Sequence, residues 1–156
     1  MCPVTSDPST PPETGGTGLG HRSVTMTRLE KGVYEVGNTR GGTLRVGGGG
    51  DTEDFTPVEL FLTAMAACSA TDVDFITSRI AEPVSFDVDS EGEKARDDGG
   101  NFMEGIEITF RVRFPDGEDG DRARGRLPKA IAQSGDRLCT VSRTVQRGAA
   151  VTYREA

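Results

Sequence analysis

The sequence has no tryptophan, a single histidine (His21) and three cysteines among its 156 residues. One histidine leaves little scope for a Cys–His nucleophile or for a metal site built on imidazole. An odd number of cysteines does not suggest a framework of structural disulfides. No window holds the roughly 18 uninterrupted apolar residues of a membrane span, and the N-terminus lacks the pattern of a secretory signal. We therefore expect a cytoplasmic protein with reduced thiols and no membrane partner.

Positive charge is also in short supply, since the 25 acidic residues outnumber the 18 lysines and arginines and give a formal net charge of −7. This balance argues against nucleic acid as the main partner. The acidic residues concentrate in segments 51–54, 87–98 and 116–121, which we interpret as solvated surface. The glycine run at 47–50 precedes an acidic segment and not a phosphate-binding turn, so we expect no nucleotide and no other cofactor.

The length fits one domain, and the composition changes once along the chain. Residues 1–20 are rich in Pro, Gly, Ser and Thr without an apolar period, which predicts a disordered N-terminal tail that contains Cys2. The remaining residues, 21–156, are predicted to form a single domain.

Alternating apolar residues and turn signals predict the strands. Three short strands should form a meander between Val24 and Val46. Two more are expected at 84–89 and 105–114, separated by a long acidic turn over 90–101, and a final strand at 149–154. A further turn is expected at 116–120.

Three segments have helical signals. Thr56 is a plausible N-cap, Pro57 suits a first helical position, and the helix that follows has apolar or small residues nearly all round. Such a helix should be central and buried. A second helix is predicted at 122–134, and a short helix or turn at 138–145. The order βββ-α-ββ-α-β predicts an α+β fold in which a strongly curved sheet covers the helices.

Two cysteine motifs resemble those of the OsmC/Ohr family. The segment Thr56-Pro57-Val58-Glu59-Leu60-Phe61, followed by Ala66-Ala67-Cys68, resembles the start of that family's central helix, in which a proline lies eleven residues before the first cysteine. Leu138-Cys139-Thr140-Val141-Ser142-Arg143 is similar to the family's Cys-Pro-Val-Ser segment, which carries the second cysteine. The resemblance extends from about residue 24 to 155.

The resemblance implies an intertwined homodimer with curved antiparallel sheets that wrap a central buried helix. It implies reduction of organic hydroperoxides in oxidative stress defence, with Cys68 as the peroxidatic and Cys139 as the resolving cysteine, recycled by a dithiol reductant. It also implies an Arg and a Glu beside the first cysteine. Arg40 is favoured for the first role, with Arg45 as its competitor, and Glu59 is the candidate for the second.

The sequence departs from the family pattern at Thr140, which replaces the proline of Cys-Pro-Val-Ser, and at Val58, which stands where the Ohr branch has its glutamate. On an ideal helix Glu59 lies on the face opposite Cys68, so it would act across the dimer interface or only cap the helix. Cys68 itself lies too far along its helix for that helix's dipole to help, so an arginine is expected to stabilise the thiolate. Apolar neighbours suited to an alkyl hydroperoxide are expected from four residues: Phe61, Met65, Phe75 and Ile76.

Two other functions remain open from the sequence. One is a non-catalytic protein of the same fold that binds an apolar small molecule and keeps its thiols as buried hydrophobic groups. The other is a metal site made of Cys68, Cys139 and carboxylates, which the lack of Cys-x-x-Cys spacing disfavours.

Overall fold

The computed structural model describes residues 18–156, and the chain forms two compact units, Met1–Pro57 and Val58–Ala156. The predicted tail at 1–20, with Cys2, falls almost entirely outside the described residues. Both that tail and the single domain at 21–156 therefore stay predictions.

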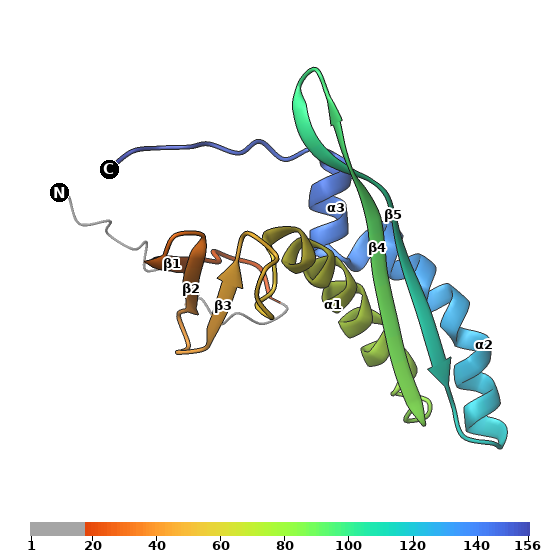
Figure 1. Ribbon diagram of the computed structural model, residues 1–156. Helices are drawn as coiled ribbons and strands as arrows, with labels where there is room; N and C mark the ends of the chain where they lie inside the picture. The colour runs from red at the N-terminus through yellow and green to blue at the C-terminus, as the bar shows by residue number, and fades with distance from the viewer. Residues whose placement is uncertain (1–17) are drawn as a thin grey trace. The chain divides into compact units, whose positions relative to one another are not determined.

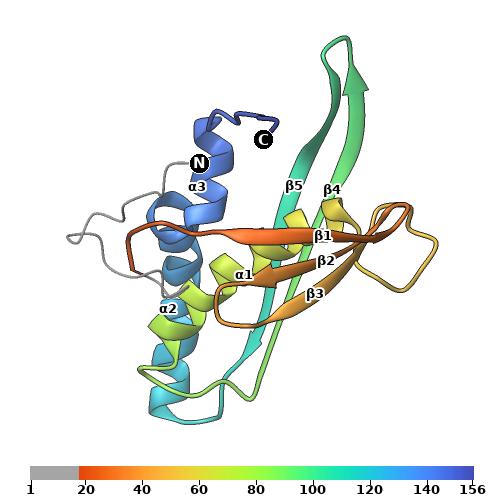
Figure 2. The same cartoon turned by 90° about the vertical axis from the view of Figure 1, so that its left-hand side faces the viewer.

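The first unit contains a three-stranded antiparallel meander, shown in Figure 2. Its strands are β1 (Val24–Glu30), β2 (Val33–Asn38) and β3 (Thr43–Gly47), in that order across the sheet. The Asn38 side-chain oxygen accepts hydrogen bonds from the backbone N–H groups of Arg40 (2.9 Å) and Gly42 (3.0 Å), which closes the β2–β3 turn. The predicted meander is confirmed.

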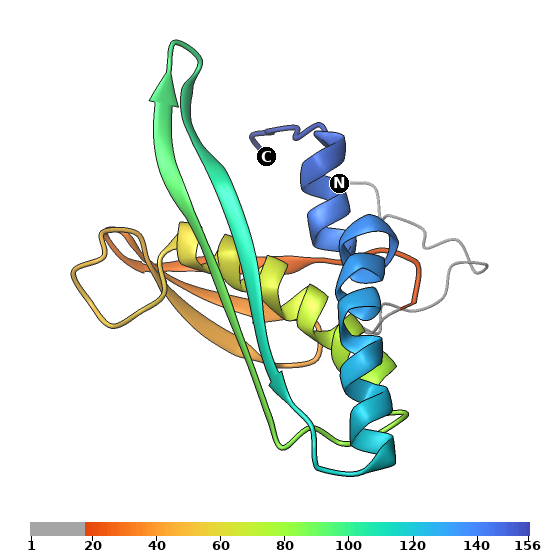
Figure 3. The same cartoon turned by 90° about the vertical axis from the view of Figure 1, so that its right-hand side faces the viewer.

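The second unit combines helices with one long β-hairpin (Figures 1 and 3). Its elements are α1 (Pro57–Thr77), β4 (Ser85–Asp97), β5 (Gly100–Arg113), α2 (Glu118–Gln133), the π-helical segment η1 (Ser134–Leu138) and α3 (Thr140–Arg147). The predicted helix at 57 begins at that residue, and most of the segment at 138–145, which was predicted as a short helix or turn, belongs to α3, which begins at Thr140.

The β4–β5 hairpin is longer than predicted, because the acidic segment at 90–101 is largely strand. The two strands pair as far as Asp97 and Gly100, and the turn lies between them. The Asp97 side chain accepts the backbone N–H of Gly99 at 2.8 Å, and Gly100 has a φ of 121°, which glycine adopts without strain. A two-stranded hairpin exposed to water needs no apolar face. The polar sequence of this segment therefore has the composition of a loop.

Two predictions near the helix ends are wrong. The turn predicted at 116–120 is the start of α2, whose first turn holds Glu118, Asp119 and Asp121, carboxylates that the positive end of a helix dipole stabilises. The strand predicted at 149–154 is absent, because α3 ends at Gly148 in the left-handed conformation (φ 62°) and residues 149–156 have no regular secondary structure.

Helix α1 buries only one face within the chain. Its buried residues recur every four positions, namely Met65, Ser69, Val73 and Thr77, whereas Phe75 is 56 % exposed. The prediction of burial all round is therefore wrong for a single chain. By its length and the mean hydropathy of an 18-residue window (1.3), α1 is long and apolar enough to cross a membrane, a criterion that the core helix of a soluble protein also meets.

Candidate active site

Two cysteines from distant parts of the chain meet in the second unit. Cys68 lies on α1 beside the buried Ser69 and is half-buried. Cys139 is fully buried and is the N-cap of α3, with extended backbone angles (φ −65°, ψ 103°). The side chains of Cys68 and Cys139 are in hydrogen-bonding contact, and both thiols are free. The fold therefore brings together two sulfur atoms that are 71 positions apart in the sequence.

The N-terminus of α3 faces both sulfur atoms. The first N–H groups of a helix have no partner within the helix and are available to an anion. Here the backbone N–H of Ser142 donates to Cys139 Sγ at 3.3 Å, and backbone groups of Val141 and Thr140 hydrogen-bond the Cys68 sulfur. Thus α3, and not the helix that carries Cys68, supplies a stabilising dipole to the Cys68 thiolate.

Burial raises the pKa of the Cys68 thiol above its ordinary value. The backbone hydrogen bond from Val141 acts in the opposite direction and lowers the pKa, but the hydrogen bond and the charge of Cys139 raise it again.

Burial would also raise the pKa of Cys139, but hydrogen bonds outweigh it and the pKa lies below its ordinary value. The strongest comes from the hydroxyl of Ser142, whose Oγ lies 3.2 Å from Sγ, and the next from the hydroxyl of Ser69. The Cys68 thiol also donates to this sulfur. Cys68 is the more accessible of the two sulfur atoms.

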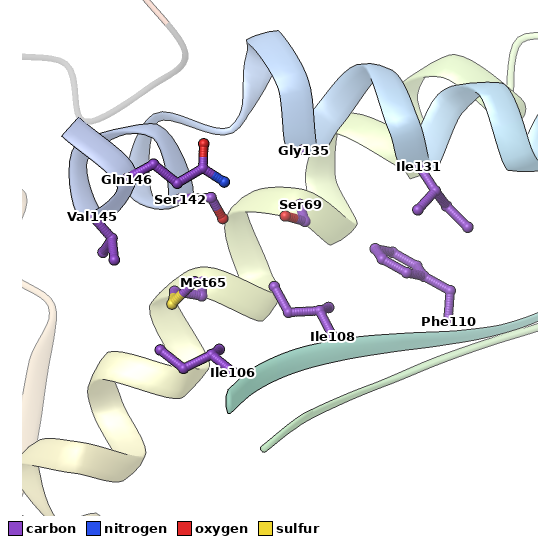
Figure 4. A pocket seen from close by; sticks show the side chains of 10 residues that line it. All are labelled: Met65, Ser69, Ile106, Ile108, Phe110, Ile131, Gly135, Ser142, Val145 and Gln146. Atoms are coloured by element: carbon purple, nitrogen blue, oxygen red, sulfur yellow. The ribbon is translucent and has the colours of Figure 1, made fainter. Parts of the chain in front are cut away.

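A cavity of about 370 Å³ adjoins the thiol pair (Figure 4). Ser69 and Ser142, which both contact Cys139, form part of its wall, and Ile106, Ile108 and Phe110 extend into it from β5. Its remaining lining residues are Met65, Ile131, Gly135, Val145 and Gln146. Of the four apolar neighbours predicted from sequence, only Met65 lines the cavity. Phe75 lies on an exposed part of α1.

A second contact joins α1 to the segment before Cys139. Ser134, fully buried at the start of η1, donates from Oγ to Asp72 Oδ2 at 2.9 Å. Its carbonyl oxygen accepts the backbone N–H of Cys139 at 2.9 Å. Sequence analysis missed this contact, as it missed Ser69. An aspartate in an apolar helix was the available signal, but its partner lies 62 residues away.

The remaining predicted site residues are not all in the unit that holds the thiols. Arg40 and Arg45 belong to the first unit, where Arg45 Nε lies 3.4 Å from Asp54 Oδ1 in an ion pair. Glu59 is in the first turn of α1, nine residues before Cys68, which corresponds to about 13 Å along the helix axis. The catalytic roles of Arg40 and Glu59 stay predictions.

The fold and the site define a small α+β protein with a partly buried dithiol beside an apolar cavity. The sequence model of the OsmC-like protein family matches residues 48–154, and the chain belongs to that family. No curated protein sequence matches the chain.

Solved structures with the same fold come from several bacteria. An OsmC-like protein of unknown function from Vibrio cholerae has a TM-score of 0.68 at 13 % identity, with 82 % of this chain and 95 % of that one covered. The OsmC-like protein of Mycoplasma pneumoniae has a TM-score of 0.65 at 14 % identity, covering 81 % and 87 %. The organic hydroperoxide resistance protein OhrB of Bacillus subtilis has a TM-score of 0.53 at 17 % identity, covering 83 % and 93 %. At these identities the likeness concerns the fold.

Proposed function

We propose that this protein reduces organic hydroperoxides with Cys68 and Cys139. The observation that carries the proposal is the hydrogen-bonding contact between the two thiols at the N-terminus of α3. Cys68 is the attacking group because it is the more accessible sulfur, whereas Cys139 is fully buried and serves as the resolving thiol. Family membership supports the proposal, since structures of the same fold include organic hydroperoxide resistance proteins.

The reaction has two balanced steps. The Cys68 thiolate attacks one peroxide oxygen, the O–O bond breaks, and the alkoxide leaves as an alcohol after it takes up the proton released by the thiol. Cys68 is then a sulfenic acid. The Cys139 sulfur attacks the Cys68 sulfur, a disulfide forms, and the hydroxyl leaves as water. A cellular dithiol returns both cysteines to thiols by disulfide exchange.

The cavity favours an alkyl hydroperoxide over hydrogen peroxide. Contact between its isoleucine and phenylalanine side chains and a hydrocarbon removes apolar surface from water, which lowers the free energy of binding. The same side chains offer no hydrogen bonds to hydrogen peroxide. The same cavity supports a second candidate function, a binding protein for an apolar small molecule in which the thiols do no chemistry.

Arg40 is the group proposed to orient the peroxide and to stabilise the departing alkoxide, with Arg45 as the alternative. Glu59 is proposed to hold that guanidinium across the interface of a homodimer, or else to cap α1. The proposed setting is a cytoplasmic homodimer that acts in oxidative stress defence.

Thiol counting separates the two candidate functions. The reduced protein is treated with a slight excess of cumene hydroperoxide, and free thiols and intact mass are then measured. A loss of two thiols with a mass decrease of about 2 Da, abolished in Cys68→Ser, supports the peroxidase. Retention of all thiols supports the binding protein.

A further inference from the structure

Helix α1 and the segment that precedes α3 are joined by two parallel contacts. The first is the pair Cys68 and Cys139, and the second is the pair Asp72 and Ser134. Asp72 follows Cys68 by four residues, so both side chains lie on one face of α1, about 6 Å apart along its axis. We call the second pair the Asp72–Ser134 link.

Ser134 connects three parts of the second unit. Its backbone N–H donates to the carbonyl groups of Ala130 and Ile131 at the end of α2. Its carbonyl accepts the N–H of Cys139 five residues later, which is the bond that closes a π-helical turn, and its hydroxyl donates to Asp72. π-Helical turns are rare overall and are frequently found at functional sites. The position of Cys139 therefore depends directly on where Ser134 is held.

We propose that Asp72 is a positioning residue for disulfide formation, acting through Ser134 to hold Cys139 against Cys68. This inference rests on the proposed function, because disulfide formation is its second step. A hydrogen bond to a carboxylate is stronger than one between neutral groups, and the partial burial of this one limits competition from water. Asp72 contacts no reacting atom and leaves the attack on the hydroperoxide to Cys68.

The consequence concerns the fate of the sulfenic acid on Cys68. It either condenses with Cys139, with loss of water, or reacts with a second hydroperoxide molecule to give a sulfinic acid and a second alcohol. Without the link, η1 moves relative to α1 and condensation slows, while the first attack keeps its rate. The partition then shifts toward sulfinic acid.

The test uses four single variants, and the double variant Asp72→Ala with Ser134→Ala, in a Cys2→Ser background, so that only the thiols of Cys68 and Cys139 are measured. Asp72→Ala and Ser134→Ala remove the link, and Asp72→Asn keeps an oxygen that accepts from Ser134. Asp74→Ala is the matched control, because Asp74 lies on the same helix and accepts the Ser78 hydroxyl at 2.6 Å without connection to Cys139. Intact mass at equal hydroperoxide excess gives the disulfide and sulfinic fractions.

We expect the ratio of sulfinic acid to disulfide to rise about tenfold in Asp72→Ala and Ser134→Ala, and no further in the double variant, since both remove one contact. The rate of the first oxidation should stay within about twofold of the parent, a separation of steps that general loss of structure would not produce. Asp72→Asn and Asp74→Ala should match the parent. An unchanged ratio in Asp72→Ala, or an equal rise in Asp74→Ala, would overturn the inference.

A second measurement keeps this result separate from the proposed function. Diamide converts a dithiol to a disulfide without any peroxide: one thiolate adds to its N=N bond, and the second thiol displaces the resulting hydrazine. Slower ring closure in Asp72→Ala with diamide supports the link even where the parent protein is inert toward hydroperoxides. A parent that reacts with hydroperoxide, together with an Asp72→Ala variant that closes at the parent rate, rejects the link alone.

Discussion

Thr140 is the residue at which this chain departs most instructively from the family pattern. Its backbone N–H reaches the Cys68 sulfur, a contact that the family's proline has no hydrogen to make. Thr140→Pro should raise the pKa of Cys68 further and slow its alkylation at neutral pH by roughly tenfold or more, since hydrogen bonds to charged groups contribute about 1.5–3 kcal/mol. The pH dependence of iodoacetamide alkylation, measured in the Cys2→Ser background, reports the change.

Thr140→Ala is the control for that substitution, because it removes the side chain and keeps the N–H. It should react as the parent does. Proline is well tolerated at the first position of a helix, so Thr140→Pro should fold. Equal alkylation profiles for Thr140→Pro and the parent would show that the N–H does not stabilise the thiolate.

The hydrogen bond and the charge of Cys139 both raise the pKa of Cys68. Cys139→Ser removes the negative charge, so the pKa of Cys68 should fall and its alkylation profile should shift to lower pH. The same variant, treated with cumene hydroperoxide, should accumulate sulfinic acid on Cys68, seen as a mass increase of about 32 Da. A profile shifted to higher pH would contradict the assignment of the charge to Cys139.

The two candidate arginines can be separated by paired substitutions. If Arg40 stabilises the alkoxide, Arg40→Ala should lower kcat/KM for cumene hydroperoxide by about a hundredfold or more, the usual effect of losing one transition-state donor. Arg45→Ala breaks the ion pair with Asp54. The Arg45 side chain is more than half exposed in this pair, so its loss should cost little activity. The reverse order of effects would transfer the role to Arg45.

The two cysteines could be selected from the sequence because their motifs are local: a proline and small residues precede Cys68, and a valine and a serine follow Cys139. Ser69, Asp72 and Ser134 could not be selected, since their roles depend on partners about 60 to 70 residues away. A polar residue on an apolar helix shows that a partner exists but does not identify it.

At the scale of elements, the start of α2 depends on a glycine. A Cβ added at Gly120 would lie 1.7 Å from the carbonyl oxygen of Pro115, so the backbone there admits no side chain. Gly120→Ala should lower the free energy of unfolding by about 1–3 kcal/mol, the usual cost of forcing atoms into a packed site. Thermal unfolding followed by circular dichroism measures it.

Gly125→Ala in the same helix is the matched comparison, since nothing lies within 4 Å of the added Cβ. Alanine has the higher helix propensity, by about 1 kcal/mol, so this variant should be more stable than the parent. A similar loss of stability in both variants would mean that the contact with Pro115 does not cause the lower free energy of unfolding of Gly120→Ala.

The elements predicted well are α1, from its Thr56 and Pro57 start signals and its run of apolar and small residues, and the meander, from its alternation and turn signals. The predictions were wrong for segments that are exposed to solvent, because such segments have no alternation of apolar and polar residues. The distal part of the β4–β5 hairpin is polar on both faces and was taken for a loop, and the acidic first turn of α2 was taken for a turn. The π-helical segment was not predicted either, because the predicted helix ended at 134 and the next element was expected only from 138, whereas Ser134 to Leu138 is helical.

At the scale of the whole molecule, α1 presents the clearest mismatch between composition and burial. An 18-residue window of this 21-residue helix has a mean hydropathy of 1.3, yet Phe75 is 56 % exposed in the single chain. Exposed apolar surface of this kind marks an interface, and the proposed homodimer would cover it. Phe75→Asp should therefore weaken self-association, because a charge at a buried interface loses its hydration without a partner. Sedimentation velocity across a range of protein concentrations measures the change.

Phe102→Asp is the comparison for that experiment. Phe102 is 39 % exposed near the end of the hairpin, on a different element, so its substitution tests whether any exposed phenylalanine has the same effect. We expect Phe75→Asp to shift the protein toward monomer while Cys68 and Cys139 still close to a disulfide with diamide, because both thiols lie within one chain. A parent protein that is monomeric at all concentrations would reject the dimer and, with it, any role for Glu59 across an interface.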